Sequence, residues 1–153
     1  MKSQSGFTLV EILIVVVILG ILAAIVIPQF TEASTEAKTS SLCTDLQTVR
    51  SQIELYKIQH NDALPGTATG VDFETAMTTY TLQTGAAADP QAPGTGVYGP
   101  YLQKVPSNPF IATAANADDV EEGAGTPGAG NAGWYFNTST GAFNADDDAH
   151  KSL

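Results

Sequence analysis

The feature of this sequence that most constrains its fold is an apolar run close to its beginning. Between Phe7 and Ile27 almost every residue is aliphatic or aromatic, and Glu11 is the single charged residue. As an α-helix rising about 1.5 Å per residue, this stretch is roughly 30 Å long, which is the thickness of the hydrocarbon core of a bilayer. We therefore predict a membrane-spanning helix over residues 7–27.

Two other interpretations compete with a retained membrane helix. A core helix of a soluble domain would need apolar surroundings, and the rest of the chain is polar and rich in small residues. A cleaved secretory signal would fit the basic start and the small residues around Ala33 to Thr35. Against the signal, the run is long, begins almost at the N-terminus and carries Glu11. The retained helix is the favoured interpretation.

Helical periodicity continues beyond Pro28, although a proline inside a helix removes a hydrogen bond and usually produces a kink. One apolar stripe recurs at spacings of four and three residues: Leu42, Leu46, Val49, Ile53 and Tyr56. The pattern predicts one long helix from about Phe7 to about His60, kinked near Pro28. Its first half lies in lipid and its second half is amphipathic, and turn-forming residues 61–66 end it.

Residues 61–153 are predicted to form a loop-rich region with a small antiparallel sheet. A short helix is expected over residues 72–82, with Phe73, Met77 and Tyr80 on one side. Loops are expected over residues 84–96 and 112–132, and a turn with an extended piece over residues 98–106. The clearest hairpin joins residues 134–136 to residues 142–144. Its aromatic strand should pack on the apolar stripe, because neither can bury its apolar face alone.

Charge and composition exclude several classes of function. The net charge is −10 and the six Lys and Arg residues are scattered, which argues against nucleic acid as a partner because phosphates need clustered cations. Cys43 is the one cysteine, so no intrachain disulfide can form, and we expect it to be partly buried on the helix. His60 and His150 lack the spacing of a zinc site. Without a nucleophile elbow or a nucleotide-binding fingerprint, an enzyme is not expected.

The most specific pattern lies where a short polar leader, residues 1–6 with the cation Lys2, meets the apolar run. The residues at this join are Gly6-Phe7-Thr8-Leu9-Val10-Glu11. They closely resemble the processing signal of the type IV pilin superfamily, which includes type IV prepilins and the pseudopilins of type II secretion. The resemblance of this signal covers about the first thirty residues, and the layout of a long helix with a small sheet extends it.

This resemblance implies specific roles at the join. A prepilin peptidase would cut between Gly6 and Phe7, and Phe7 would then be N-methylated. Glu11 corresponds to the assembly glutamate of the superfamily. A carboxylate near the end of a membrane helix is costly in lipid without a partner. Cleavage creates such a partner, the α-ammonium group of Phe7, and Glu11 can meet that group of the next subunit between staggered helices, which sets their register.

Gly20 and Pro28 form a second feature of the helix, since both residue types weaken helical structure. In filaments of the superfamily the equivalent stretch can lose helical order when the subunit leaves the membrane. The alternative is that both are simply tolerated, as Gly and Pro commonly are in membrane helices. Both interpretations remain open at this point.

The globular half is most similar to the major pseudopilin of type II secretion systems. The similarity is carried by Gly99-Pro100-Tyr101-Leu102, Val105-Pro106, Asn108-Pro109-Phe110, Gly133-Trp134-Tyr135 and the turn Thr140-Gly141. That pseudopilin often holds calcium near its C-terminus, but here Asn108 stands where an aspartate is usual. Asp146, Asp147 and Asp148, and the acidic cluster from Asp118 to Glu122, are calcium candidates by composition alone.

We therefore predict an α+β, type IV pilin-like fold with a long N-terminal helix packed on a small antiparallel sheet. The regions are a leader (1–6), a transmembrane and assembly helix (7–27), its amphipathic continuation (28–60) and a periplasmic region (61–153). Lys2 before the helix and a large acidic region after it predict a cytoplasmic N-terminus in the bacterial inner membrane.

The resemblance implies a structural filament subunit of a type II secretion system, cleaved and N-methylated by prepilin peptidase. Its other expected partners are identical subunits, the inner-membrane assembly machinery and the lipid bilayer, and the product is a periplasmic pseudopilus. The alternatives are a type IV pilus pilin for adhesion or motility, a membrane-tethered periplasmic binding domain that never polymerises, and a secreted protein.

Overall fold

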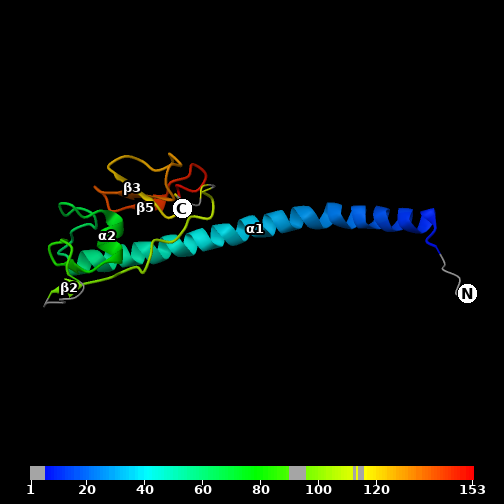
Figure 1. The fold of residues 1–153 in the computed structure, drawn as a ribbon. Helices are drawn as coiled ribbons and strands as arrows, with labels where there is room; N and C mark the ends of the chain where they lie inside the picture. Colours follow the sequence, from blue (N-terminus) through cyan, green and yellow to red (C-terminus); the bar gives the residue numbers. More distant parts are fainter. Residues whose placement is uncertain (1–5, 90–95, 112, 114–115) are drawn as a thin grey trace, which may run out of the picture. The chain divides into compact units, whose positions relative to one another are not determined.

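The computed structural model describes residues 6–89, 96–111, 113 and 116–153. The chain forms two compact units, Met1–Thr39 and Ser40–Leu153. One helix, α1 (Leu9–Gln59), begins in the first unit and ends in the second (Figure 1). The predicted helix over residues 7–60 is therefore confirmed to within two residues at each end, and it continues through Pro28.

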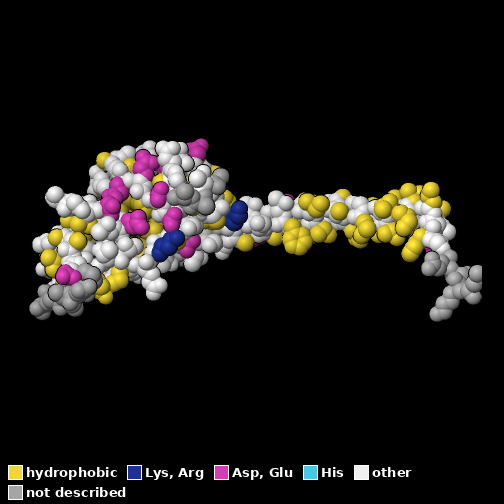
Figure 2. Space-filling model, in the orientation of Figure 1, with side chains coloured by type: hydrophobic (Ala, Val, Ile, Leu, Met, Phe, Trp, Pro, Cys, Tyr) yellow, Lys and Arg dark blue, Asp and Glu magenta, His cyan; other side chains and the backbone are white. Residues whose placement is uncertain are grey.

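The first unit contains the apolar part of α1, where hydrophobic side chains cover the surface (Figure 2). From Phe7 to Phe30 every side chain is exposed. By length and composition, α1 contains a stretch that could cross a membrane, and that stretch is not buried by any described part of the chain.

In the second unit, α1 presents its predicted stripe to the core. Leu42, Leu46, Val49, Ile53 and Tyr56 are all buried. Beyond the helix, Asn61 and Asp62 have φ values of 54° and 63°, the left-handed region that Asn and Asp tolerate better than most residues. The turn formers thus end the helix as predicted. Cys43 is exposed, so the expectation that it is partly buried is wrong.

The second helix, α2 (Phe73–Thr78), is shorter than the predicted segment 72–82. Asp72 caps its start, since the Asp72 carboxylate accepts a hydrogen bond from the N–H of Thr75 (2.7 Å). Phe73 and Met77 are buried as expected, but Tyr80 is exposed. The reason is that the chain becomes extended after α2 and forms β1 (Thr81–Leu82), which pairs antiparallel with β2 (Val97–Tyr98).

The main sheet contains β3 (Val120–Gly123), β4 (Trp134–Asn137) and β5 (Phe143–Ala145), in that order. The predicted hairpin is confirmed, because β4 and β5 pair antiparallel. The strand β3 lies inside the predicted loop 112–132 and runs parallel to β4, so the sheet is mixed rather than wholly antiparallel. Local pattern could not reveal β3, since its sequence Val-Glu-Glu-Gly has a single apolar residue and depends on β4 for its hydrogen bonds.

The core of the second unit joins the sheet to the stripe on α1. Trp134, Phe136 and Phe143 belong to one buried cluster with the stripe residues and with Phe73. The indole N–H of Trp134 donates a hydrogen bond to the carbonyl of Pro106 (2.7 Å), which satisfies the one polar atom of this buried side chain. The aromatic strand therefore packs on the amphipathic part of α1, as the sequence predicts.

Candidate assembly site at the start of the long helix

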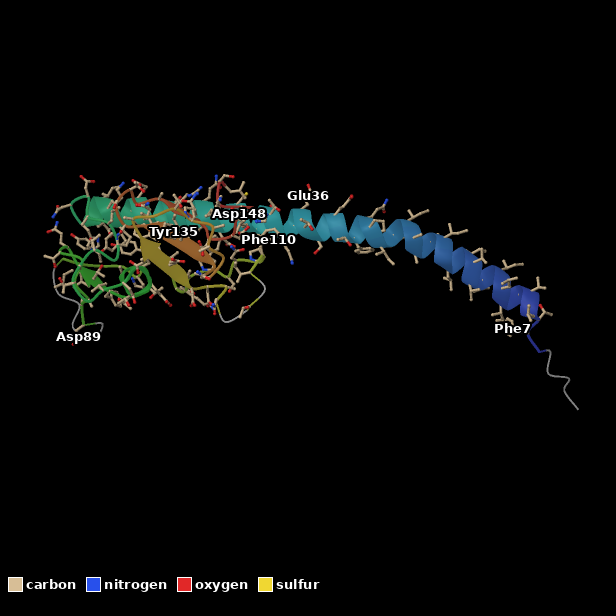
Figure 3. All side chains as sticks on the ribbon, turned by 90° about the horizontal axis from the view of Figure 1, so that it is seen from above. Phe7, Glu36, Asp89, Phe110, Tyr135 and Asp148 are labelled. Carbon is tan, nitrogen blue, oxygen red and sulfur yellow. The ribbon has the colours of Figure 1, made fainter. Side chains whose placement is uncertain are left out.

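The residues on either side of the predicted cleavage site are open to the surroundings. The side chain of Phe7 is 83% exposed and lies at the start of α1 (Figure 3). A Cβ atom added to Gly6 would have no described atom within 4 Å. Packing within the described chain therefore does not require a glycine at residue 6.

Thr8 and Glu11 form a reciprocal pair that begins α1. The Glu11 Oε2 atom accepts hydrogen bonds from the Thr8 N–H (2.8 Å) and from the Thr8 hydroxyl (2.7 Å). In return, the Thr8 hydroxyl oxygen accepts one from the Glu11 N–H (3.3 Å). This arrangement is a capping box, which satisfies backbone donors that a helix start would otherwise leave free.

Thr8 is a residue of the site that the sequence prediction missed. The signal was present, because a Ser or Thr followed three residues later by an acidic residue, before an apolar run, is the sequence pattern of a capping box. The pair fixes the rotamer of Glu11 within its own helix. Both bonds to the carboxylate end on Oε2, which leaves the Oε1 lone pairs available to a donor from outside the described chain.

Gly20 and Pro28 both lie within α1 in the first unit. A Cβ atom at Gly20 would meet nothing within 4 Å apart from the backbone of its own helix, so close packing inside the chain does not explain this glycine. Near Pro28, the Thr31 hydroxyl donates a hydrogen bond to the carbonyl of Ile27 (3.2 Å). The loss of helical order in this stretch during assembly stays a prediction.

The three consecutive aspartates proposed as calcium candidates have different partners. Asp146 is fully buried and accepts hydrogen bonds from four backbone N–H groups, those of Gly128, Ala129, Asn131 and Ala132. Asp147 accepts from the backbone N–H of His150 and contacts its ring. Asp148 forms an exposed ion pair with Lys151. The three carboxylates thus do not converge.

The acidic cluster from Asp118 to Glu122 is likewise divided among separate contacts. Asp118 pairs with Lys104 (2.8 Å), and this hydrogen bond lowers the pKa of Asp118 and raises that of Lys104. Glu122 accepts a hydrogen bond from the N–H of Phe73 at the start of α2 (2.8 Å). Partial burial raises the pKa of Glu122. Within residues 6–89, 96–111, 113 and 116–153, no three His, Cys, Asp or Glu side chains gather as a metal site would require, so these donors do not fit a bound calcium ion.

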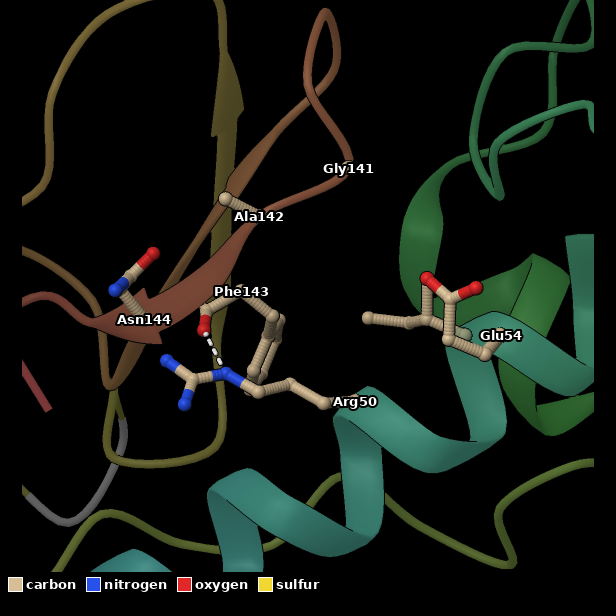
Figure 4. Close-up of a pocket in the computed structure, with 7 residues that line it drawn as sticks. Arg50, Glu54, Gly141, Ala142, Phe143 and Asn144 are labelled. Atoms are coloured by element: carbon tan, nitrogen blue, oxygen red, sulfur yellow. Dashed lines mark hydrogen bonds between the residues drawn. The ribbon is translucent and has the colours of Figure 1, made fainter.

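One surface pocket and the buried His60 are occupied by contacts that hold the fold together. A pocket of about 330 Å³ is lined by Arg50, Ile53, Glu54 and residues 141–144. Arg50 reaches across it and donates to the carbonyl of Phe143 (2.9 Å), a contact that ties β5 to α1 (Figure 4). His60 meets the Thr81 hydroxyl (3.0 Å), but both residues are buried and therefore closed to a substrate.

Comparison with known proteins identifies the family. The prokaryotic N-terminal methylation motif matches residues 1–27. Type II secretion system core protein G of Pseudomonas aeruginosa is 37% identical over 109 residues, covering 71% of this chain and 70% of the relative. The chain belongs to the family of type II secretion system core protein G. The corresponding proteins of Aeromonas hydrophila (31% identical, 71% of this chain and 69% of the relative) and Vibrio cholerae (32%, 72% and 68%) agree.

A relative outside secretion systems covers a smaller part of the chain. A fimbrial protein of Pseudomonas aeruginosa is 41% identical over 54 residues, which is 35% of each chain. No solved structure matches the chain. The predicted resemblance to the major pseudopilin is therefore confirmed over most of the chain, whereas the match to this fimbrial protein spans about a third of it.

Proposed function

We propose that this protein is a structural pseudopilin, which polymerises into the periplasmic pseudopilus of a type II secretion system. The observation that carries the proposal is the exposed apolar half of α1, which begins with the Thr8–Glu11 capping box in a chain of the core protein G family. Its role is mechanical rather than enzymatic. The relatives' name supports the secretion system, and the methylation motif supports processing.

The apolar half of α1 needs a cover that the described chain does not supply. Large aliphatic side chains from Leu9 to Ile27 are between 42% and 81% exposed. Exposed apolar surface of this extent marks a membrane or an assembly contact. We propose that lipid covers it before assembly and that the helices of neighbouring subunits cover it in the filament. The cytoplasmic placement of Lys2 and the periplasmic placement of the second unit follow from the positive-inside rule.

Removal of residues 1–6 by a prepilin peptidase is the step that we propose to enable assembly. It would create an α-ammonium group at Phe7, one helical turn from Glu11. The open position of Gly6 supports access by a peptidase, and the match at residues 1–27 supports N-methylation of Phe7. Because Glu11 Oε2 is already bonded to Thr8, we propose that Oε1 accepts the ammonium group of an adjacent subunit.

The processing step can be tested by intact mass of the protein purified from membranes that contain the peptidase. We expect a chain that starts at Phe7 and carries one additional methyl group. Gly6→Leu should keep the full length, because a side chain there obstructs the peptidase. Gly20→Leu is a matched control, since Gly20 is equally free of neighbours within 4 Å, and it should be cut normally. Cleavage near Ala33, or normal processing of Gly6→Leu, would reject the proposed site.

Two alternative functions predict different behaviour. A type IV pilus pilin is favoured by a fimbrial relative, whose match covers 35% of this chain. Such a pilin should assemble when it is produced with a pilus machinery and not with a secretion machinery. A tethered periplasmic binding domain should assemble with neither.

A further inference from the structure

The loop between β3 and β4 is organised around Asp146, the residue that follows β5. Five consecutive backbone N–H groups, residues 128–132, donate to this one residue. Gly128 and Ala129 donate to Oδ1 at 2.9 and 3.2 Å, and Asn131 and Ala132 donate to Oδ2 at 3.2 and 3.3 Å. The N–H between them, that of Gly130, donates to the backbone carbonyl of Asp146 (2.7 Å).

The backbone of the loop explains how successive amides reach one carboxylate. Gly128 and Gly130 have φ values of 115° and 70°, a region in which a side chain would be strained. Alternating backbone conformations of this kind direct neighbouring N–H groups to the same side and create a concave anion site. The carboxylate that fills this site belongs to the chain itself, and it is fully buried.

The chemistry of this arrangement is opposite to that of a calcium site. Calcium takes six to eight oxygen ligands, whereas four N–H groups direct the positive ends of their dipoles at the Asp146 carboxylate. A cation placed there would be repelled by these donors and would have to displace them. Both oxygen atoms of the carboxylate already have two donors each, so the negative charge is compensated without a metal.

Asn108 extends the same pattern beside the start of β4, where it shares the carbonyl of Gly133 with the N–H of Asp146. This buried side chain donates from Nδ2 to the carbonyl of Gly133 (2.8 Å) and lies 3.4 Å from a carboxylate oxygen of Asp147. The pseudopilin resemblance implies an aspartate at this position. Its carboxylate would lie beside the carbonyl oxygen of Gly133 and the carboxylate oxygen of Asp147, and three acceptors together would favour a cation. The amide of Asn108 supplies the donor instead.

We propose that the hydrogen bonds to Asp146 hold the 128–132 loop of this pseudopilin in the way that a bound cation otherwise would. The loop therefore folds without calcium. The loop is fixed to the end of β5 by hydrogen bonds that are internal to the chain. The folded state of the second unit is therefore independent of the divalent cation concentration around it. This property concerns the globular unit and does not depend on whether the subunit polymerises.

The test uses the full-length protein in detergent micelles, with its single tryptophan as the reporter. Trp134 pairs with Ala145 across β4 and β5, so its fluorescence reports unfolding beside Asp146. Thermal unfolding is measured in EDTA and in about 10 mM CaCl2, a concentration well above the dissociation constants of weak extracellular calcium sites. A ligand that binds only the folded state must raise the unfolding midpoint. We expect the same midpoint in both solutions, and a midpoint that rises with calcium would overturn the proposal.

A pair of variants tests the role of the carboxylate. Asp146→Asn places an amide donor against backbone donors, so the midpoint should fall by several degrees. Asp148→Asn, whose side chain is 84% exposed, should leave it unchanged. Equal midpoints for Asp146→Asn and the wild type would also overturn the proposal.

Hydrogen–deuterium exchange of the wild type covers the case in which Asp146→Asn does not fold. The amides of residues 128–132 should exchange slowly in EDTA, because all five are bonded to Asp146. Slow exchange that appears only after calcium is added would show that a metal holds the loop, and it would overturn the proposal.

Discussion

The carboxylate of Glu11 and the hydroxyl of Thr8 close the first turn of α1 on each other. Thr8 donates to Glu11 Oε2 from both its N–H (2.8 Å) and its hydroxyl (2.7 Å). A carboxylate in a membrane helix that bonds within its own chain is less costly to hold in lipid than a free one. This pairing stabilises Glu11 in the unassembled subunit and presents its second oxygen atom in one orientation.

The first prediction concerns Glu11 and separates a polymer from a tethered monomer. A membrane anchor needs no carboxylate, so Glu11→Ala should insert and be cut after Gly6 like the wild type. Filament formation should fail, because the ammonium group of Phe7 has no counter-charge on its neighbour. Glu11→Asp should recover part of it, since its shorter side chain reaches less far. Filament counts by electron microscopy and crosslinking between neighbouring subunits measure the effect.

The control for this prediction is the capping partner. Thr8→Ser keeps the hydroxyl and should assemble normally, whereas Thr8→Ala removes it and should weaken the start of the helix by about 0.5–2 kcal/mol, the usual cost of losing an N-cap.

If Glu11→Ala forms as many filaments as the wild type, Glu11 has no part in assembly. If the wild type forms none in the presence of its secretion machinery, the tethered monomer is the better description.

The parts of the fold that could be predicted are those whose signal is local. The stripe Leu42, Leu46, Val49, Ile53 and Tyr56 is visible because helical periodicity places neighbours three or four residues apart. The hairpin of β4 and β5 is visible because aromatic residues flank a short turn that contains Gly141. Both depend on residues that are close in the sequence.

The parts that could not be predicted depend on distant partners. The strand β3 exists through its pairing with β4, and α2 ends early because Thr81 pairs with Tyr98 on β2. The aspartates at 146–148 suggested a shared site by composition, but their partners lie in a loop fourteen or more residues earlier and in the residues that follow. Composition gives the number of carboxylates, and only the fold decides whether they face one another.

The second prediction tests the packing of the aromatic strand. Trp134 is fully buried against Phe143, with ring centroids 5.3 Å apart. Trp134→Ala should lower the free energy of unfolding by about 3–5 kcal/mol, the usual cost of truncating a large buried aromatic residue. Denaturant titration of the second unit within the full chain, followed by circular dichroism, measures this. Ile58→Ala is the control, since Ile58 is 76% exposed and should change stability by less than about 0.5 kcal/mol. A similarly small effect at Trp134 would contradict the described core.

The third prediction concerns Arg50, which joins α1 to two distant segments. Its Nε donates to the carbonyl of Phe143 and its Nη2 to the carbonyl of Leu153, both at 2.9 Å. Arg50→Met keeps most of the aliphatic side chain but removes both donors, and should cost about 1–3 kcal/mol, as for hydrogen bonds from a charged group. Lys57→Met on the same helix is the control. Lys57 pairs with the exposed Glu54, and such surface pairs contribute about 0–1 kcal/mol. Equal effects of the two changes would show that the Arg50 contacts do not stabilise the fold.

The last prediction concerns the pH dependence of stability and rests on Glu122. Burial, together with the negative charge of Asp72, raises the pKa of Glu122 above its ordinary value of 4.5. The folded state therefore holds this proton more tightly than the unfolded state, and stability falls as the pH rises from about 4.5 through the raised pKa. Glu122→Gln cannot ionise but can still accept the hydrogen bond from the Phe73 N–H.

The difference in unfolding free energy between Glu122→Gln and the wild type should consequently shift in favour of the variant across that pH range and then become constant. Glu121→Gln, on the exposed side of the same strand, is the matched control and should follow the wild type at every pH. Asp72 acts in the opposite direction, because hydrogen bonds from Thr75 lower its pKa and its contribution is lost as the pH falls below 3.8. Denaturant titrations between pH 3 and pH 8 therefore separate the two carboxylates. A pH-independent difference between Glu122→Gln and the wild type would mean that Glu122 titrates alike in the folded and unfolded chain, which would contradict its burial against α2.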